Sequence, residues 1–136
     1  MNKSILFFSL LLLLFSQACD PSLPPSATEL LTGQNWRPFS YEAPDASDQQ
    51  KLNYSDILEE MRITYEEDGT YEITFENGIA DTQRGTWSFN GDETEITLRD
   101  NVNGNSSLSV EDLQSVSFVY SLEDSIGEVT VFCLAN

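Results

Sequence analysis

Apolar and polar residues alternate along much of the chain after residue 60. Six stretches show this period of two, with their apolar residues on one shared face: Met61, Ile63 and Tyr65; Tyr71, Ile73 and Phe75; Trp87 and Phe89; Ile96 and Leu98; Val116, Phe118 and Tyr120; and Val129, Val131 and Cys133. Glu, Thr, Ser and Arg are frequent at the positions between them. Such alternation is typical of antiparallel strands that bury one face and expose the other, so it predicts an all-β domain.

The turn residues between these stretches predict hairpins. Asp68-Gly69 and Asn90-Gly91 each separate two successive stretches, and both dipeptides tolerate the positive φ that tight hairpins need. Residues 43–56 and 100–109 are polar and rich in turn formers, so they predict longer loops. Residues 35–42 predict a first strand, and Pro38 within it indicates an edge position or a bulge.

A short helical turn is predicted before the first strand. Ser26 and Glu29 have the spacing of a capping box, and Gly33 suits the end of a helix. With this turn and about seven or eight antiparallel strands, the pattern fits an up-and-down antiparallel β-barrel. A β-sandwich of the same strands is the alternative, because a period of two does not distinguish one closed sheet from two packed sheets.

The N-terminus has the order of a secretory signal peptide. Lys3 precedes an apolar run from Ile5 to Phe15 that only Ser9 interrupts, and residues 16–18 are small or polar. The run is about half the roughly 20 residues that a helix needs to cross a bilayer, so a transmembrane anchor is not expected. We therefore predict that residues 1–18 are a signal peptide.

Cys19 follows this segment directly. A cysteine after Ala18, followed by Pro-rich chain, resembles the lipobox of bacterial lipoproteins, in which the signal is cut before the cysteine and the sulfur receives a lipid. The resemblance implies a lipidated Cys19, a tether over residues 19–27, a folded domain over residues 28–136 and attachment to a membrane. The alternatives are an ordinary cleaved signal and a disulfide from Cys19 to Cys133, although the apolar surroundings of Cys133 predict a buried thiol.

Charge and missing residue types restrict the function. The chain has 23 Asp and Glu against 6 Lys and Arg, a formal net charge of −17, which repels phosphate backbones and makes nucleic-acid partners unfavourable. It has no His, no G-x-S-x-G motif and no phosphate-binding glycine loop, so we expect a protein that is not an enzyme and that holds no cofactor or metal. An irregular calcium site formed by Asp100, Asn101 and Asn103 is the alternative for that loop.

Several short motifs together resemble a known family. "ELLTGQNWRPFSYE", "YEEDGTYEITFENG" and "RGTWSFNGDETEITL" are similar to segments of the small lipocalin-like lipoproteins of Gram-negative, Bacteroidetes-type bacteria. The resemblance implies an up-and-down β-barrel held in the cell envelope as an outer-membrane lipoprotein. The larger lipocalin family has a G-x-W motif in its first strand, whereas here Gly33 and Trp36 are one residue further apart and Gly85-Thr86-Trp87 lies in the middle of the chain.

The aromatic residues of the predicted inner face are the candidate ligand site. They are Tyr65, Tyr71, Phe75, Trp87, Phe89, Phe118 and Tyr120. A barrel of about eight strands either fills with such side chains or holds one small ligand. We therefore expect a small hydrophobic or amphipathic ligand, with plain core packing as the alternative.

A second function class is docking to another envelope protein through the first strand. Trp36, Phe39 and Tyr41, close to the irregularity at Pro38, are the candidate contacts. One further motif, Asp124-Ser125-Ile126, resembles an acceptor site for O-glycosylation in some bacteria. The alternative is an ordinary turn that contains Ser125.

Overall fold

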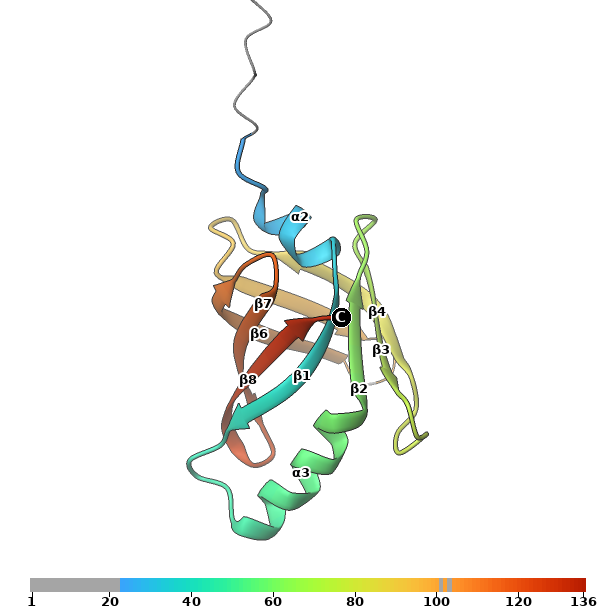
Figure 1. Ribbon diagram of the computed structural model, residues 1–136, viewed down its shortest axis with the longest axis vertical. Coiled ribbons are helices and arrows are strands. Elements are labelled where there is room, and N and C mark those ends of the chain that lie inside the picture. The colour runs from blue at the N-terminus through green and yellow to red at the C-terminus, as the bar shows by residue number, and fades with distance from the viewer. Residues whose placement is uncertain (1–22, 101, 103) are drawn as a thin grey trace, which may run out of the picture.

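Eight antiparallel strands close into a single barrel in the computed structural model, which describes residues 23–100, 102 and 104–136. Each strand pairs with the next in sequence, and the last pairs with the first, so the barrel is of the up-and-down type and the sandwich alternative is wrong (Figure 1). The elements in chain order are α2 (Ala27–Thr32), β1 (Asn35–Glu42), α3 (Asp48–Glu60), β2 (Met61–Tyr65), β3 (Thr70–Phe75), β4 (Gln83–Phe89), β5 (Glu95–Asp100), β6 (Gly104–Leu113), β7 (Ser117–Asp124) and β8 (Gly127–Ala135).

The predicted alternation accounts for the core. Directly opposed residues of antiparallel strands share a face, so the pairs Tyr65↔Tyr71 and Trp87↔Leu98 both point inward. All four of these side chains are buried. One residue of the predicted inner face is wrong: Val116 is 62% exposed, because β7 begins only at Ser117 and Val116 lies in the preceding turn.

The predicted long loop over residues 43–56 is wrong, because most of it belongs to helix α3. Ser47 and Gln50 form a capping box at its start, each side chain accepting a hydrogen bond from the backbone N–H of the other. Only Leu58 is fully buried in this helix. Without a periodic apolar face the helix has no hydrophobic signal, and the spacing of Ser47 and Gln50 was the sequence feature that could have indicated it.

The second predicted loop, residues 100–109, is also mostly wrong. Strand β6 begins at Gly104 and pairs with β5 through residues such as Asn105 and Ser107. Residues 104–107 are all exposed, and Leu108 is the first buried residue of the strand. Backbone hydrogen bonding to β5 holds this segment, and such bonds do not require apolar side chains.

Both predicted hairpins form, but only one of them has the predicted residue at positive φ. Gly69 has φ +83° in the β2–β3 turn, as expected for Asp68-Gly69. In the β4–β5 turn the residue with positive φ is Glu93, at 60°, and not Gly91. Asn90 organises that turn instead, because its Oδ1 accepts hydrogen bonds from the backbone N–H of Thr94 (2.9 Å) and Glu95 (3.0 Å).

Of the two alternatives predicted for Pro38, an edge position or a bulge, the structure shows the bulge: the β1–β8 register shifts between Pro38 and Ser40. On its other side β1 pairs with β2 only through Asn35↔Thr64 and Trp36↔Ile63, which we call the β1–β2 seam. Beyond the seam, α3 packs against β1 and β3 and continues into β2 (Figure 1). The barrel wall is therefore completed there by a helix and not by strand pairing.

Helix α2 packs against β2 and β6 at the other end of the barrel, on the side from which the N-terminal chain leaves (Figure 1). Its Leu31 is fully buried, and the carbonyl oxygen of Leu31 accepts a hydrogen bond of 2.9 Å from Trp36 Nε1. The predicted helical turn is thus confirmed, including the capping box of Ser26 and Glu29. No helix among the described residues is long and apolar enough to span a bilayer.

Candidate functional site

The interior of the barrel brings six of the seven candidate aromatic residues into one cluster. Tyr65 is at its centre, with ring centroids 5.6 Å from Trp87, 6.4 Å from Phe118 and 6.5 Å from Tyr71. Phe89 joins through Trp87 at 5.5 Å, and Tyr120 through Phe118 at 5.1 Å. Phe75 is half-buried at the end of β3 and makes none of the ring contacts of the described residues.

Trp36 also belongs to this cluster, although the sequence indicated it as a docking contact on the first strand. Its ring centroid lies 5.6 Å from that of Phe118, and its side chain is fully buried. The pairs Tyr65–Trp87, Tyr65–Phe118 and Trp87–Phe89 pack edge against face, and the other ring pairs of the cluster are tilted, as is common in protein cores. The cluster therefore fills the space that it lines, and the packing alternative describes the interior as it stands.

Tyrosine hydroxyls give this apolar interior a polar character. Burial raises the pKa of Tyr65 and of Tyr120 well above the usual value, because a phenolate would lose its hydration there. The pKa of Tyr71 is raised by burial and by the charge of Asp100. At neutral pH these groups are therefore uncharged hydroxyls that can donate a hydrogen bond.

Cys133 is a free thiol on the inner face of β8, 1% exposed, as its apolar surroundings predict. Burial raises its pKa to about 12, so it is present as the thiol at neutral pH. A thiol is a poor nucleophile compared with a thiolate. Its role in the barrel is that of a small apolar side chain.

Helix α3 covers the end of the barrel next to the β1–β2 seam with two side chains. Leu58 is 4% exposed, and the Tyr54 ring lies 5.3 Å from the ring of Tyr41 on β1. The Tyr41 hydroxyl donates a hydrogen bond to the carbonyl oxygen of Lys51. Burial, followed by the charge of Asp124, raises the pKa of Tyr54 to about 12, which places this side chain at the β7–β8 turn.

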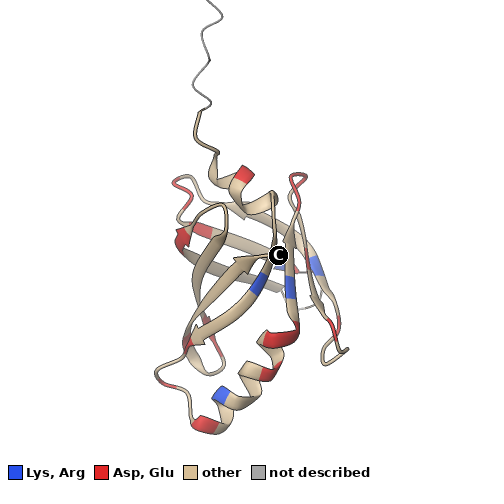
Figure 2. Ribbon diagram, in the orientation of Figure 1, with Lys and Arg blue, Asp and Glu red and all other residues tan. Residues whose placement is uncertain are grey.

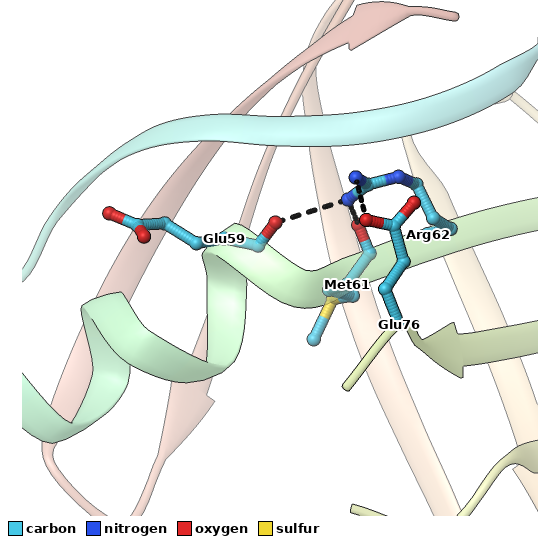
Figure 3. Close-up of polar contacts among 4 residues, drawn as sticks. All are labelled: Glu59, Met61, Arg62 and Glu76. Carbon is cyan, nitrogen blue, oxygen red and sulfur yellow. Dashed lines mark hydrogen bonds and ion pairs between the residues drawn. The ribbon is translucent and has the colours of Figure 1, made fainter. Parts of the chain in front are cut away.

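The C-terminal end of α3 is held by Arg62 (Figure 3). The guanidinium of Arg62 donates to the carbonyl oxygens of Glu59 (3.1 Å) and Met61 (2.7 Å), and it forms an ion pair of 2.8 Å with Glu76. A cation at this position satisfies carbonyl groups that the end of a helix leaves without partners. The helix is thus fixed at its junction with β2 and held by Tyr41 and Tyr54 further toward its start.

The structure separates the three candidate docking residues. Trp36 is in the core, Tyr41 is half-buried against Tyr54, and only Phe39 is available, with 61% of its surface exposed. Two further apolar residues on or beside the outer face of β8 and β7 are exposed: Leu134 (46%) and Val116 (62%). We call Phe39, Val116 and Leu134, together with half-buried Phe132 between them, the outer apolar strip.

Three further sequence-based expectations concern the N-terminal leader with Cys19, the calcium hypothesis and Ser125. The signal peptide and Cys19 lie outside the described residues, as do Asn101 and Asn103 of the calcium hypothesis. Within the described part, no three His, Cys, Asp or Glu side chains gather closely enough to hold a metal ion. Ser125 is exposed in the turn between β7 and β8.

Comparisons with known proteins agree with this architecture. A crystal structure of a DUF4847 family protein from Bacteroides vulgatus superposes with a TM-score of 0.56 at 14% identity, covering 82% of this chain and 98% of the other. A lipocalin-like protein from Bacteroides uniformis gives a TM-score of 0.54 at 19% identity, covering 76% of this chain and 96% of the other. No family model and no curated protein matches the sequence. At these identities the likeness concerns the fold, and the chain has a lipocalin-like β-barrel fold.

Proposed function

We propose that this protein is a lipid-anchored barrel of the cell envelope that takes up a small hydrophobic or amphipathic ligand beneath α3. The observation that carries the proposal is the β1–β2 seam, where only two residue pairs join the strands and a helix completes the wall. The aromatic cluster approaches α3 through Tyr120, because Val131 of β8 is directly opposite both Tyr120 and Tyr41. The Tyr41 ring in turn contacts Tyr54 of α3. A ligand that displaces α3 reaches the cluster without breaking a long strand pairing.

Uptake requires side chains to move, because the interior is filled. Leu58 and Tyr54 are the side chains that α3 contributes to this end of the barrel. Removing a buried aliphatic side chain from the core costs about 2 kcal/mol. A ligand that buries a similar apolar area offsets that loss, so the site favours molecules with an aliphatic or aromatic body over small polar ones.

The polar part of the ligand is constrained by the interior hydroxyls. Tyr65 and Tyr120 are uncharged at neutral pH, and their O–H groups can donate to a carbonyl, ether or hydroxyl oxygen. Ser121 is the only buried polar or charged residue of the described chain, so the interior holds no cation that could balance an anionic head group. We therefore infer a neutral or weakly polar head group.

A reversible cross-link across the entrance tests this function. Ser40 on β1 and Ser55 on α3 line the same small hollow of about 50 Å³, so Ser40→Cys and Ser55→Cys can be joined by a short bifunctional methanethiosulfonate. We expect saturable fluorescence enhancement of N-phenyl-1-naphthylamine with the wild-type protein, its loss in the linked variant and its return on reduction. Each single variant treated with the same reagent is the control. Absence of saturable uptake by the wild-type and reduced proteins would contradict the proposal.

The lipid anchor is proposed from the position of Cys19 after an apolar leader and before a Pro-rich segment. Metabolic labelling with palmitate should mark the wild-type chain and not the Cys19→Ala variant. Equal labelling of the two forms, or no labelling of the wild type, would remove the anchor from the proposal. The buried thiol of Cys133 provides no competing acceptor in the folded protein.

A second candidate function is non-enzymatic docking to an envelope protein, which the outer apolar strip favours. Phe39, Val116 and Leu134 are each at least 46% exposed on a chain that otherwise presents many acids. Capture of a partner from solubilised envelope should be lost with Phe39→Ser. It should persist with Leu52→Ser, since Leu52 is 62% exposed on α3 and does not belong to the strip. Equal capture by the two variants would exclude docking through this strip.

A further inference from the structure

The outer wall of the barrel carries a hollow, bordered by charged and hydroxyl side chains, that the proposed function does not use. It lies over β2 to β5 and has a volume of about 720 Å³, within the range of pockets that hold small ligands. Two cross-strand rows build it. One row is Thr64, Glu72 and Arg84, and the other is Thr70, Thr86 and Arg99. We call these six residues the β2–β5 groove.

Sheet register, and not flexible loops, sets the positions of these side chains. Within each row, every residue is directly opposite the next on the neighbouring strand. The two rows are two residues apart on β3 and on β4, so all six side chains point to the outer face. Their spacing is therefore fixed by the backbone hydrogen bonds of the barrel.

Arginine is rare in this protein, and the groove holds two of its residues. Figure 2 shows that the basic residues of the described chain lie mostly on the strands, whereas acidic residues are frequent in α3 and the turns. Arg84 Nε is 2.6 Å from Glu72 Oε2, which balances its charge and raises its pKa. Arg99 has no carboxylate within ion-pair distance among the described residues and makes no side-chain hydrogen bond there. It is exposed and is the uncompensated cation of the two rows.

The threonines of the groove offer oxygens as acceptors. The Thr64 hydroxyl donates to Asn35 Oδ1 (3.0 Å), and the Thr70 hydroxyl donates to Asp68 Oδ1 (2.6 Å). Because their hydrogens are engaged, the lone pairs of both oxygens remain for donors from outside. Glu66 also lines the hollow and adds a carboxylate acceptor at its edge.

This set of groups matches one ligand chemistry. An unpaired guanidinium binds a carboxylate through two parallel hydrogen bonds, and hydroxyl and carboxylate oxygens accept hydrogen bonds from the hydroxyls of a ligand. The only aromatic residue of the lining, Tyr71, is 4% exposed, so the hollow presents no exposed aromatic ring on which a hydrophobic body could stack. We propose that the β2–β5 groove binds a hydroxylated monocarboxylate of the uronic-acid type, with Arg99 on the carboxylate and Thr64, Thr70 and Glu66 on the hydroxyls.

Titration of the full chain with galacturonate, followed by amide chemical shifts, tests this site. We expect saturable shifts confined to β2–β5 and affinities at least about tenfold weaker for galactose, which lacks the carboxylate, and for acetate, which lacks the hydroxyls. Arg99→Gln should weaken galacturonate binding about tenfold, the loss of one charge-assisted pair. Arg37→Gln is the matched control, because Arg37 is also exposed and without an ion pair but lies on β1, outside the groove.

The following outcomes would overturn the proposal. They are the absence of shifts in β2–β5, an unchanged affinity in Arg99→Gln, and binding of galactose or acetate as tight as that of galacturonate. Galactose 6-phosphate binding in preference to galacturonate would also overturn it, by showing that the groove selects phosphate. The result does not depend on ligand uptake beneath α3, because the six groove side chains point to the outer face and the cluster side chains point inward. Tyr71 is the one cluster residue that also lines the hollow.

Discussion

Gly85 is the residue at which the barrel has least room for a side chain. A Cβ there would lie 2.1 Å from the carbonyl oxygen of Arg99 and 2.9 Å from Tyr71 Cε1. The first of these atoms belongs to the backbone of β5 and cannot rotate away. The glycine of the sequence Gly85-Thr86-Trp87 is therefore required by the close approach of β4 and β5 beside the Tyr71 ring.

We expect Gly85→Ala to lower the free energy of unfolding by about 3 kcal/mol, as overpacking against backbone does. Gly91→Ala is the matched control, because nothing lies within 4 Å of its Cβ position and its φ is not positive. It should change the free energy of unfolding by less than about 0.5 kcal/mol. Urea unfolding followed by circular dichroism measures both, and equal stabilities of the two variants would show that β4 can shift away from β5.

Cys133 provides a second test at the scale of a single residue. Its thiol is 1% exposed and its pKa is about 12, so reagents that need an accessible thiolate should not modify it in the native protein. Labelling of a Cys19→Ala chain with iodoacetamide should then occur only through unfolding, and its rate should rise with urea. Ser125→Cys, placed in an exposed turn, should be labelled at once. Fast labelling of Cys133 in the native protein would mean that the inner face of β8 opens locally.

At the scale of elements, α3 is attached to the barrel by few side chains. Leu58 is 4% exposed, whereas Leu52 on the same helix is 62% exposed. We expect Leu58→Ala to lower the free energy of unfolding by about 2 to 3 kcal/mol, and Leu52→Ala to change it by less than about 0.5 kcal/mol. Hydrogen exchange of residues 48–60 should become faster in Leu58→Ala alone. Equal exchange in the two variants would show that Tyr41 and Tyr54 hold the helix without Leu58.

The elements differ in how much of them the sequence revealed. Strands β2, β5, β7 and β8 bury alternate residues, and β3 and β4 bury Tyr71 and Trp87. In all six strands the sequence shows the alternation of apolar and polar residues directly. Helix α3 and the start of β6 bury Leu58 and Leu108 and almost nothing else, so they leave no hydrophobic period. Both were predicted as loops for that reason. They are held by capping and by backbone pairing, which contribute to structure without an apolar pattern.

At the scale of the whole molecule, the buried hydroxyl and thiol groups make stability depend on alkaline pH. Cys133 titrates at about 12 in the folded protein against an ordinary value of 9.0, and Tyr54 at about 12 against 10.0. The pKa values of Tyr65 and Tyr120 are raised as well. Between about pH 9 and pH 12 the unfolded chain releases protons that the folded chain retains, so the free energy of unfolding falls as the pH rises.

We therefore expect the Tm to be unchanged by these groups below about pH 9 and to fall progressively above it. Each group that is ionised in the unfolded chain but not in the folded chain lowers the free energy of unfolding by about 1.4 kcal/mol per pH unit. Tyrosinate absorbance should rise together with the loss of β-sheet circular dichroism, since ionisation of the buried tyrosines requires unfolding. Tyr120→Phe should reduce the slope. A constant Tm up to pH 11 would contradict the burial of these groups.

The site was less predictable than the fold. Alternation identifies which residues point inward, and six of the seven candidate aromatics do meet in one cluster. It does not indicate whether the rings leave a space between them, because that depends on the diameter and closure of the barrel. Trp36 was placed on the docking surface, since Pro38 suggested an edge strand, whereas barrel closure gives β1 a partner on both sides.

The sequence by itself determined most of the strands, their inner faces and the N-terminal capping box, because each depends on residues close together in the chain. Only the tertiary structure decided that the sheet closes, that α3 completes the wall at the β1–β2 seam and that Arg84 and Arg99 come together beside three threonines. These features depend on register between strands far apart in sequence. Register follows from the packing of the whole barrel, and no local pattern contains it.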